Sequence, residues 1–179
     1  LKSVIAGSVV VMPGWQLVDD GDLLFTGSAG PSVALESDVS TPGQMQVGGN
    51  LYFSGGSGMA SIRSDGAAAL PGQVHLTGAA PEFLVGPSLT LLVSAPVDGA
   101  SAHLDDGGLL ELAGPNTFGG VMVGDGKLQA DSPAALGAGA ITFTGGTLVL
   151  HTALPIANAL TAAPTDSISV DVEIPSAQI

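Results

Sequence analysis

The sequence has no cysteine and only three basic side chains, and each shortage excludes a class of function. Without cysteine, neither a disulfide framework nor a thiolate metal site is possible. Lys2, Arg63 and Lys127 are opposed by 16 Asp and Glu, which gives a formal net charge of -13. Nucleic acids and anionic membrane surfaces are bound through cations that neutralise phosphates. We therefore expect neither of them as a partner.

Long hydrophobic runs and aromatic residues are also scarce. No apolar run approaches the roughly 18 residues that cross a bilayer as a helix, so we expect no direct membrane insertion of this segment. A charged fraction of 11% with a hydrophobic fraction of 45% does not match the composition of disordered chains. The 27 Gly and 12 Pro predict many tight turns between short strands. With no starting Met, no secretion leader and no anchor, the sequence reads as part of a longer polypeptide.

Residues 107–150 show the clearest pattern, four short alternating stretches separated by glycine-rich turns. Alternate side chains in a strand point to opposite faces, so each stretch has one apolar row and one mostly polar row. Strands this short cannot bury an apolar row alone and need similar strands stacked above and below them. The sequence therefore predicts an all-β fold, a parallel β-solenoid. The apolar pairs are Leu110 and Leu112, Leu128 and Ala130, Ile141 and Phe143, and Leu148 and Leu150.

Short motifs in the same region resemble the passenger-associated repeat of bacterial autotransporters. They are NTFGG at 116–120, GKL at 126–128, AALG at 134–137 and TGGTL at 144–148. The resemblance covers residues 104–174 closely, and residues 1–103 follow it more loosely as further coils. No change of composition divides the chain, so we expect residues 1–179 to form a single segment.

The resemblance implies a right-handed parallel β-helix with about 20–22 residues per coil. It also implies a secreted bacterial protein, exported through the periplasm to the outer membrane and exposed at the cell surface. Such a passenger domain would be a non-enzymatic stalk or adhesin, a rigid scaffold that contacts other proteins or glycans. The alternative is a self-assembling structural protein, whose solenoid ends or sides associate into an extracellular filament, sheath or matrix.

An internal repeat favours stacked coils. DGAAAL at 65–70 is similar to DSPAAL at 131–136, Leu76-Thr77-Gly78 to Phe143-Thr144-Gly145, and 101–104 to 169–172. The offsets lie near 66 residues, which three coils of about 22 residues would give. The chain would then form about eight coils and a rod of roughly 40 Å.

Candidate catalytic or metal-binding residues are few, and we expect no cofactor. His75, His103 and His151 each lie on the predicted outer row without a second His or Cys at ligand spacing, so we interpret them as solvated and without partners. The acidic turns at 19–22 and 105–107 supply oxygen atoms suitable for calcium, yet they lack the periodicity of calcium-binding β-rolls. We interpret them as turn-forming Asp-Gly segments.

Enzymes that hydrolyse or cleave pectin also use parallel β-helices, so catalysis on a polysaccharide is an alternative function for this fold. Clustered carboxylates are suited to polysaccharide hydrolysis, but three scattered cations are a poor match for an acidic polymer. No nucleophile motif is present either. The sequence predicts a protein that is not an enzyme.

Four polar or aromatic residues have structural interpretations. Asn116 and Asn158 are expected to bond the backbone of adjacent coils at turns. Trp15 and Tyr52 have the amphipathic rings that stack on sugars, but we place them in core or capping positions.

The alternation also predicts which side chains face inward. The inward set is Ile141, Phe143, Leu148, Leu150, Ile168, Val170 and Val172. The outward set is Lys127, Gln129, Thr142, Asp171 and Glu173.

Overall fold

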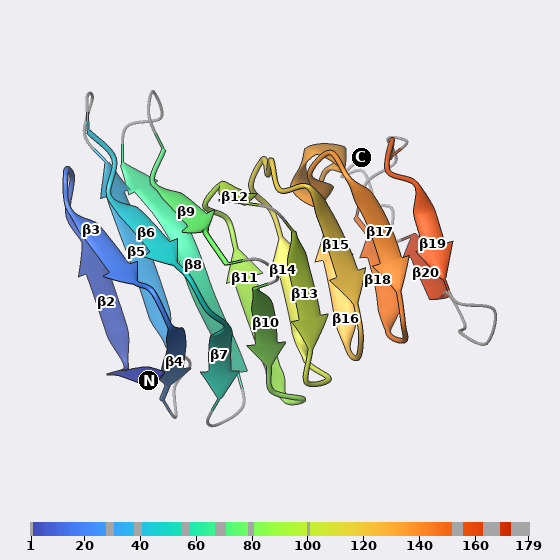
Figure 1. The fold of residues 1–179 in the computed structure, drawn as a ribbon, viewed down its shortest axis with the longest axis horizontal. Helices are drawn as coiled ribbons and strands as arrows, with labels where there is room; N and C mark the ends of the chain where they lie inside the picture. The colour runs from blue at the N-terminus through green and yellow to red at the C-terminus, as the bar shows by residue number, and fades with distance from the viewer. Residues whose placement is uncertain are drawn as a thin grey trace, which may run out of the picture.

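The computed structural model describes residues 2–27, 31–37, 41–54, 58–66, 71–78, 81–99, 101–151, 156–162 and 169–172. Within these ranges the chain is all-β with three parallel sheets, and it has one short 3₁₀ helix and no α-helix. The strands follow one another along the long axis of the molecule from the N-terminal end (Figure 1). None of the described helical residues forms a segment long and apolar enough to span a bilayer.

Sheet A contains eight parallel strands. Its order is β1-β4-β7-β10-β13-β15-β17-β19, so the strands lie in the sheet in the order in which they occur in the sequence. The bounds are β1 Lys2–Ala6, β4 Asp22–Thr26, β7 Leu51–Ser54, β10 Glu82–Val85, β13 Ala102–Asp105, β15 Gly120–Val123, β17 Ala140–Phe143 and β19 Leu160–Ala162.

Sheet B also contains eight parallel strands, and each of them directly follows a strand of sheet A. Its order is β2-β5-β8-β11-β14-β16-β18-β20. The bounds are β2 Ser8–Val11, β5 Ser32–Ser37, β8 Gly58–Gly66, β11 Leu89–Val93, β14 Leu109–Leu112, β16 Lys127–Ala130, β18 Thr147–Leu150 and β20 Ser169–Val172.

Sheet C has four strands and ends halfway along the stack. Its order is β12-β9-β6-β3, with bounds β3 Gln16–Asp19, β6 Gln44–Val47, β9 Gln73–Leu76 and β12 Val97–Gly99. We call each successive set of strands from sheets A, B and, where present, C a rung; the first rung is β1, β2 and β3. After the fourth rung, the described residues between sheets B and A contain no sheet C strand, and in one rung they form the 3₁₀ helix η1, Pro133–Leu136.

Two asparagines continue the contacts between rungs where sheet C ends. The Asn116 side chain is buried; its Oδ1 accepts a hydrogen bond from the Val97 amide at 2.8 Å, and its Nδ2 donates to the Ala135 carbonyl at 2.6 Å. Asn158 donates from Nδ2 to three carbonyls just after or within η1, the shortest to Gly139 at 2.7 Å. The prediction that both amides bond the backbone of adjacent rungs is confirmed.

The core is a continuous apolar interior built by in-register stacking of inward side chains. In sheet A, Leu23 lies beside Leu51, and Phe25 lies beside Phe53. The two phenylalanine rings stack with centroids 5.0 Å apart and planes 12° apart. Burial alternates along most strands, as in β9 and β10, because every second residue points inward.

The predicted orientation is confirmed at the positions that can be compared, with one correction. Ile141, Phe143, Leu148 and Leu150 are buried, Lys127 is exposed and Thr142 is partly exposed. Gln129 was expected to face solvent, but its side chain is 9% exposed, and it donates to Asp131 Oδ1 at 3.3 Å. Gln129 points outward like the rest of its row, where its neighbours in the sheet are Glu111 and the buried Val149.

Three of the expected orientations can be compared only in part. Val170, Asp171 and Val172 belong to β20 and pair with Leu148, Val149 and Leu150 through the backbone. Ile168 and Glu173 lie outside the described residues.

Two of the three matches in the internal repeat do not join structurally equivalent segments. Leu76 belongs to β9 of sheet C, whereas Phe143 belongs to β17 of sheet A. Residues 102–104 lie in β13 of sheet A, whereas 169–172 form β20 of sheet B. The prediction is wrong for these two matches because short Ala-, Gly- and Thr-rich strands of different sheets are similar in sequence, and sheet C stops at β12. In the remaining match, Asp65 and Gly66 end β8 and Asp131 directly follows β16, so both lie at the ends of sheet B strands three rungs apart. Residues 67–70 lie outside the described residues.

Candidate functional site

All three histidines lie beside a carboxylate on a neighbouring rung. His75 Nδ1 is 2.8 Å from Asp98 Oδ1, and both residues belong to sheet C. His103 Nδ1 is 3.2 Å from Glu82 Oε1 across β13 and β10 of sheet A. The prediction that the histidines have no partners is therefore wrong, although they do lie on the outer rows.

The third pair connects the strand ends of sheet B. His151 Nδ1 is 3.4 Å from Asp131 Oδ1, and the two residues directly follow β18 and β16. All three pairs are partly exposed, and an exposed ion pair contributes only about 0–1 kcal/mol. Among the described residues, no three His, Asp or Glu side chains form a group that can hold a metal ion.

A second acidic group lies beside His151. Burial, followed by the charge of Asp131 and a hydrogen bond to its side chain, raises the pKa of Glu111 above its usual value, and the charge of His151 opposes this shift. Gln129 lies beside Glu111 in the same outward row of sheet B. The Glu111 carboxyl therefore favours its protonated form more than an exposed carboxyl does, because burial and a neighbouring negative charge both disfavour its ionisation.

The acidic turns are organised by their own hydrogen bonds. Asp19 Oδ1 accepts from the Gly21 amide at 2.8 Å, and Asp105 Oδ1 accepts from the Asp106 amide at 2.9 Å. Asp106 has a φ of 80°, which a residue followed by glycine adopts in a tight turn. The interpretation of these segments as turn-forming is confirmed.

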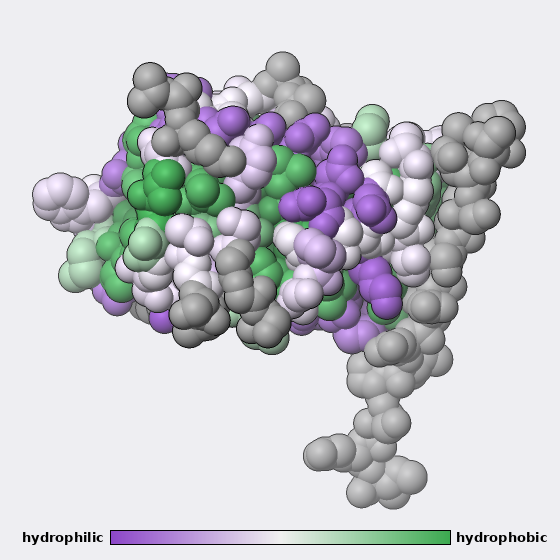
Figure 2. Space-filling view, turned by 90° about the horizontal axis from the view of Figure 1, so that it is seen from below, coloured by the Kyte–Doolittle hydropathy of each residue, from purple (hydrophilic) through white to green (hydrophobic). Residues whose placement is uncertain are grey.

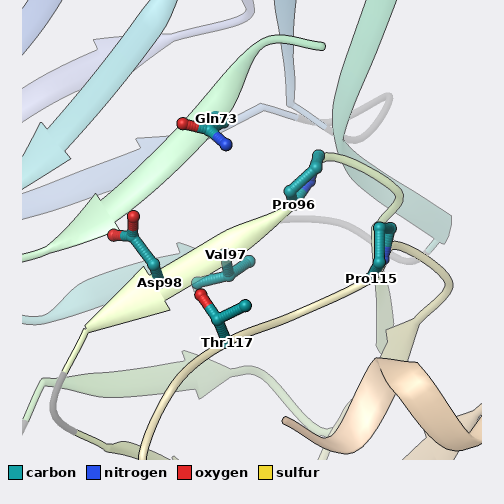
Figure 3. Close-up of a pocket in the computed structure, with 6 residues that line it drawn as sticks. All are labelled: Gln73, Pro96, Val97, Asp98, Pro115 and Thr117. Atoms are coloured by element: carbon teal, nitrogen blue, oxygen red, sulfur yellow. The ribbon is translucent and has the colours of Figure 1, made fainter. Parts of the chain in front are cut away.

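A small hollow lies where sheet C ends (Figure 3). It has a volume of about 50 Å³, and Pro96 and Pro115 line one side of it, with Gln73 and Asp98 at the other. Ligand pockets usually enclose about 300–1,000 Å³. This hollow has room for a few water molecules rather than for a sugar ring.

The first rung carries most of the exposed large hydrophobic side chains of the described residues. Trp15 is 72% exposed, so of its two expected places, core or cap, the core is wrong. Tyr52, on β7, is partly exposed on the outward row of sheet A. The other exposed large hydrophobic residues of the first rung are Val4, Val10, Met12 and Val18. Those outside the first rung are Met59, Met122 and Leu160.

No family model, curated protein or solved structure matches this chain.

The sequence identified the histidines and acidic turns but not the contacts between them. Partners such as His103 and Glu82 are separated by 21 residues, whereas Gln16 and Gln44, also in contact, are separated by 28. Because the spacing between rungs varies, the partner of an outward side chain can be assigned only when the register is known. The sequence signal for these side-chain contacts would be a polar residue at the same position of consecutive strands.

Proposed function

We propose that this chain is a rigid, non-enzymatic scaffold exposed at a bacterial cell surface, built as a right-handed parallel β-helix. The observation that carries the proposal is the pair of eight-stranded parallel sheets around one continuous apolar interior. Such a ladder joins every rung to the next by backbone hydrogen bonds and core contacts. A structure of this kind resists bending and holds a contact surface away from its anchor.

Contacts between rungs in the second half are spaced close to the lower end of the proposed coil of about 20–22 residues. Asn116 contacts residues 19 positions away on both sides, and Asn158 reaches back 19 to 22 residues. In the first half, Gln16 contacts Gln44 across 28 residues, and Asn50 contacts Glu82 across 32. The larger separations fit loops inserted into coils of the same core size, because loops tolerate insertion.

Hand and length follow from general rules of parallel sheets. Crossover connections between parallel strands are right-handed in about 98% of cases, which favours a right-handed helix. Strands lie about 4.8 Å apart, so a stack of eight rungs is roughly 40 Å long. Outward rows and loops, rather than an enclosed pocket, would then make the contacts with protein or glycan surfaces.

The similarity to autotransporter passengers supports export through the periplasm and a role in adhesion or display. Parallel rungs can form one after another as the chain emerges, because each rung is a template for the next. A chain without cysteine cannot be trapped by disulfide crosslinks during that passage.

Surface labelling of intact cells tests the proposal. An antibody raised against the chain should label cells that produce the parent protein, and protease added outside should remove the signal. A periplasmic protein in the same cells is the control and should survive the protease. Labelling that requires permeabilised cells would contradict the surface location.

A self-assembling filament, sheath or matrix protein is the second candidate. The exposed apolar side chains of the first rung favour it, since isolated stalks of soluble proteins rarely expose several large hydrophobic residues together. Electron microscopy of the purified chain would show ordered fibres if this candidate holds and dispersed particles if it does not.

A further inference from the structure

We propose that the small hollow where sheet C ends binds the acetamido group of an N-acetylated sugar. The proposal rests on the proposed scaffold that contacts glycans, and it names the class of glycan and the place of contact. The sugar ring lies outside the hollow, across the outward face of sheet C.

Outward positions of three consecutive rungs form the hollow. In sheet C, Val74 pairs with Val97, and the Thr117 amide of the next rung donates to the Val97 carbonyl at 2.9 Å. Val74, Val97 and Asn116 are buried, and because side chains alternate, the residues on either side of each of them face outward. These outward residues are Gln73 and His75, Pro96 and Asp98, and Pro115 and Thr117.

A change of side-chain length along the stack leaves the space. Gln16, Gln44 and Gln73 occupy the same outward position of β3, β6 and β9, and we call them the glutamine column. The next two rungs place Pro96 and Pro115 at this position. A proline ring closes back on its own backbone nitrogen, so it extends less far from the sheet than a glutamine does. The hollow is the step between the long amides and the short rings.

The hollow has the size of a small substituent. Its volume is about 50 Å³. A water molecule needs about 10–15 Å³ of such volume, so the hollow has room for about four non-hydrogen atoms. An acetamido group, which consists of a methyl carbon, a carbonyl carbon, an oxygen and a nitrogen, is of this size. A whole sugar ring is too large.

The lining supplies both kinds of contact that an acetamido group requires. The rings of Pro96 and Pro115 lie on one side, and Gln73, Asp98 and Thr117 lie around the other (Figure 3). The methyl group packs against the rings. The acetamido oxygen accepts a hydrogen bond from the Gln73 amide, and its N–H donates to the Asp98 carboxylate. Small-molecule sites usually combine an apolar lining with a few polar groups in this way.

These polar groups are available for a ligand. Among the described residues, the Gln73 amide and the Thr117 hydroxyl have no hydrogen-bond partner. Asp98 is held by His75, whose Nδ1 lies 2.8 Å from one carboxylate oxygen and 2.9 Å from the other. Each carboxylate oxygen has two lone pairs, so Asp98 can accept a further hydrogen bond. Because Asp98 is already held in place, little of its side-chain freedom is lost on binding.

The charges of sheet C favour an uncharged glycan. Its four strands contain no Lys or Arg, and their carboxylates are Asp19 and Asp98. Other acidic residues, such as Asp105, Asp106 and Asp125, lie where the chain passes from sheet A to sheet B, and hydrophilic side chains gather toward the middle of that edge (Figure 2). An acidic or sulfated sugar would meet Asp98 without a Lys or Arg beside it. Amides of the glutamine column instead suit the hydroxyl groups of a neutral sugar.

Saturation-transfer NMR of the purified 179-residue chain tests the site with two disaccharides. One is diacetylchitobiose, and the other is cellobiose, which has the same linkage but carries hydroxyl groups in place of the acetamido groups. We expect diacetylchitobiose to bind with the strongest transfer at its acetyl methyl protons. Cellobiose should bind at least about tenfold more weakly, because it lacks the methyl and amide contacts. No binding of diacetylchitobiose, or equal binding of the two, would overturn the proposal.

Two substitutions locate the binding. Thr117→Tyr places a ring at the hollow, and Gln73→Leu keeps a side chain of similar size without the amide. Each should weaken binding of diacetylchitobiose by about tenfold or more. The control Thr142→Tyr, on the outward row of sheet A, should leave binding unchanged. Circular dichroism verifies folding, and either folded site variant is sufficient: unchanged affinity in it would place the ligand elsewhere and refute the site.

A third ligand separates glycans from acetylated proteins. A short peptide with an Nε-acetyl-lysine carries the same acetamido group without a sugar, and it should bind at least about tenfold more weakly than diacetylchitobiose because it makes no contact with the glutamine column. Equal or tighter binding of the peptide would overturn the assignment to a glycan. Surface labelling of cells does not depend on either ligand, so labelled cells together with a chain that binds no disaccharide would refute this site alone.

Discussion

Replacing Phe143 by Ala should strongly destabilise the stack, whereas replacing its neighbour Thr142 should not. Phe143 is fully buried, and in the sheet its partners are Val123 on one side and Ala162 on the other. Neither is large enough to fill the space that the ring leaves. Phe→Ala substitutions in cores cost about 3–5 kcal/mol, and we expect about 4 kcal/mol here.

The matched substitution Thr142→Ala removes one hydrogen bond on the outward row. Thr142 Oγ1 lies 3.0 Å from Thr161 Oγ1 at an exposed site, so the expected loss is about 0.5 kcal/mol or less. Urea denaturation followed by circular dichroism measures both changes. With a slope of about 2 kcal/mol per molar urea, the Phe143→Ala midpoint should fall by about 2 M. Equal shifts for the two variants would refute the inward and outward assignment of β17.

Three further results are expected. Asn116→Ala should lower the unfolding free energy by about 1–3 kcal/mol in the same urea assay, because the buried Ala135 carbonyl loses its donor. Gly139→Ala should prevent normal folding or destabilise it by more than about 3 kcal/mol, since a Cβ there would overlap a backbone carbonyl of the facing rung; a wild-type midpoint would contradict that packing. The pKa of Glu111 is raised in the folded state, so its protonation adds stability at low pH that is lost as pH rises through this pKa. Glu111→Gln should therefore stabilise the protein at neutral pH relative to wild type and flatten the change of the melting temperature as pH rises through this pKa, and an unchanged profile would show that burial and the charge of Asp131 do not raise the pKa of Glu111.

Much of the fold was predictable because it depends on local patterns. Alternation of apolar and polar residues specified strands such as β17 and β18, and it also placed Phe143 inside. The Asn in NTFGG predicted an amide bonded to neighbouring backbone, since few side chains can supply both a donor and an acceptor at a turn.

The failures share a physical cause, which is that the register between distant strands is not encoded locally. The apparent repeat joined Leu76 to Phe143, but the two occupy different sheets because sheet C ends at β12. Gln129 was assigned to solvent from its row alone, whereas packing against neighbouring outward residues buries it. A side chain's direction follows from its strand, but its exposure depends on what the neighbouring rungs place beside it.

By itself, the sequence determined the all-β character, the shortage of cations and the positions of most inward residues, because composition and a two-residue period act over a few neighbouring positions. Only the tertiary structure decided which strands pair, that each histidine meets a carboxylate, and that Trp15 lies exposed on the first rung. Those contacts join residues separated by variable loops. Their formation depends on the stacking of whole rungs, in which core packing and backbone hydrogen bonds select one register among many locally similar ones.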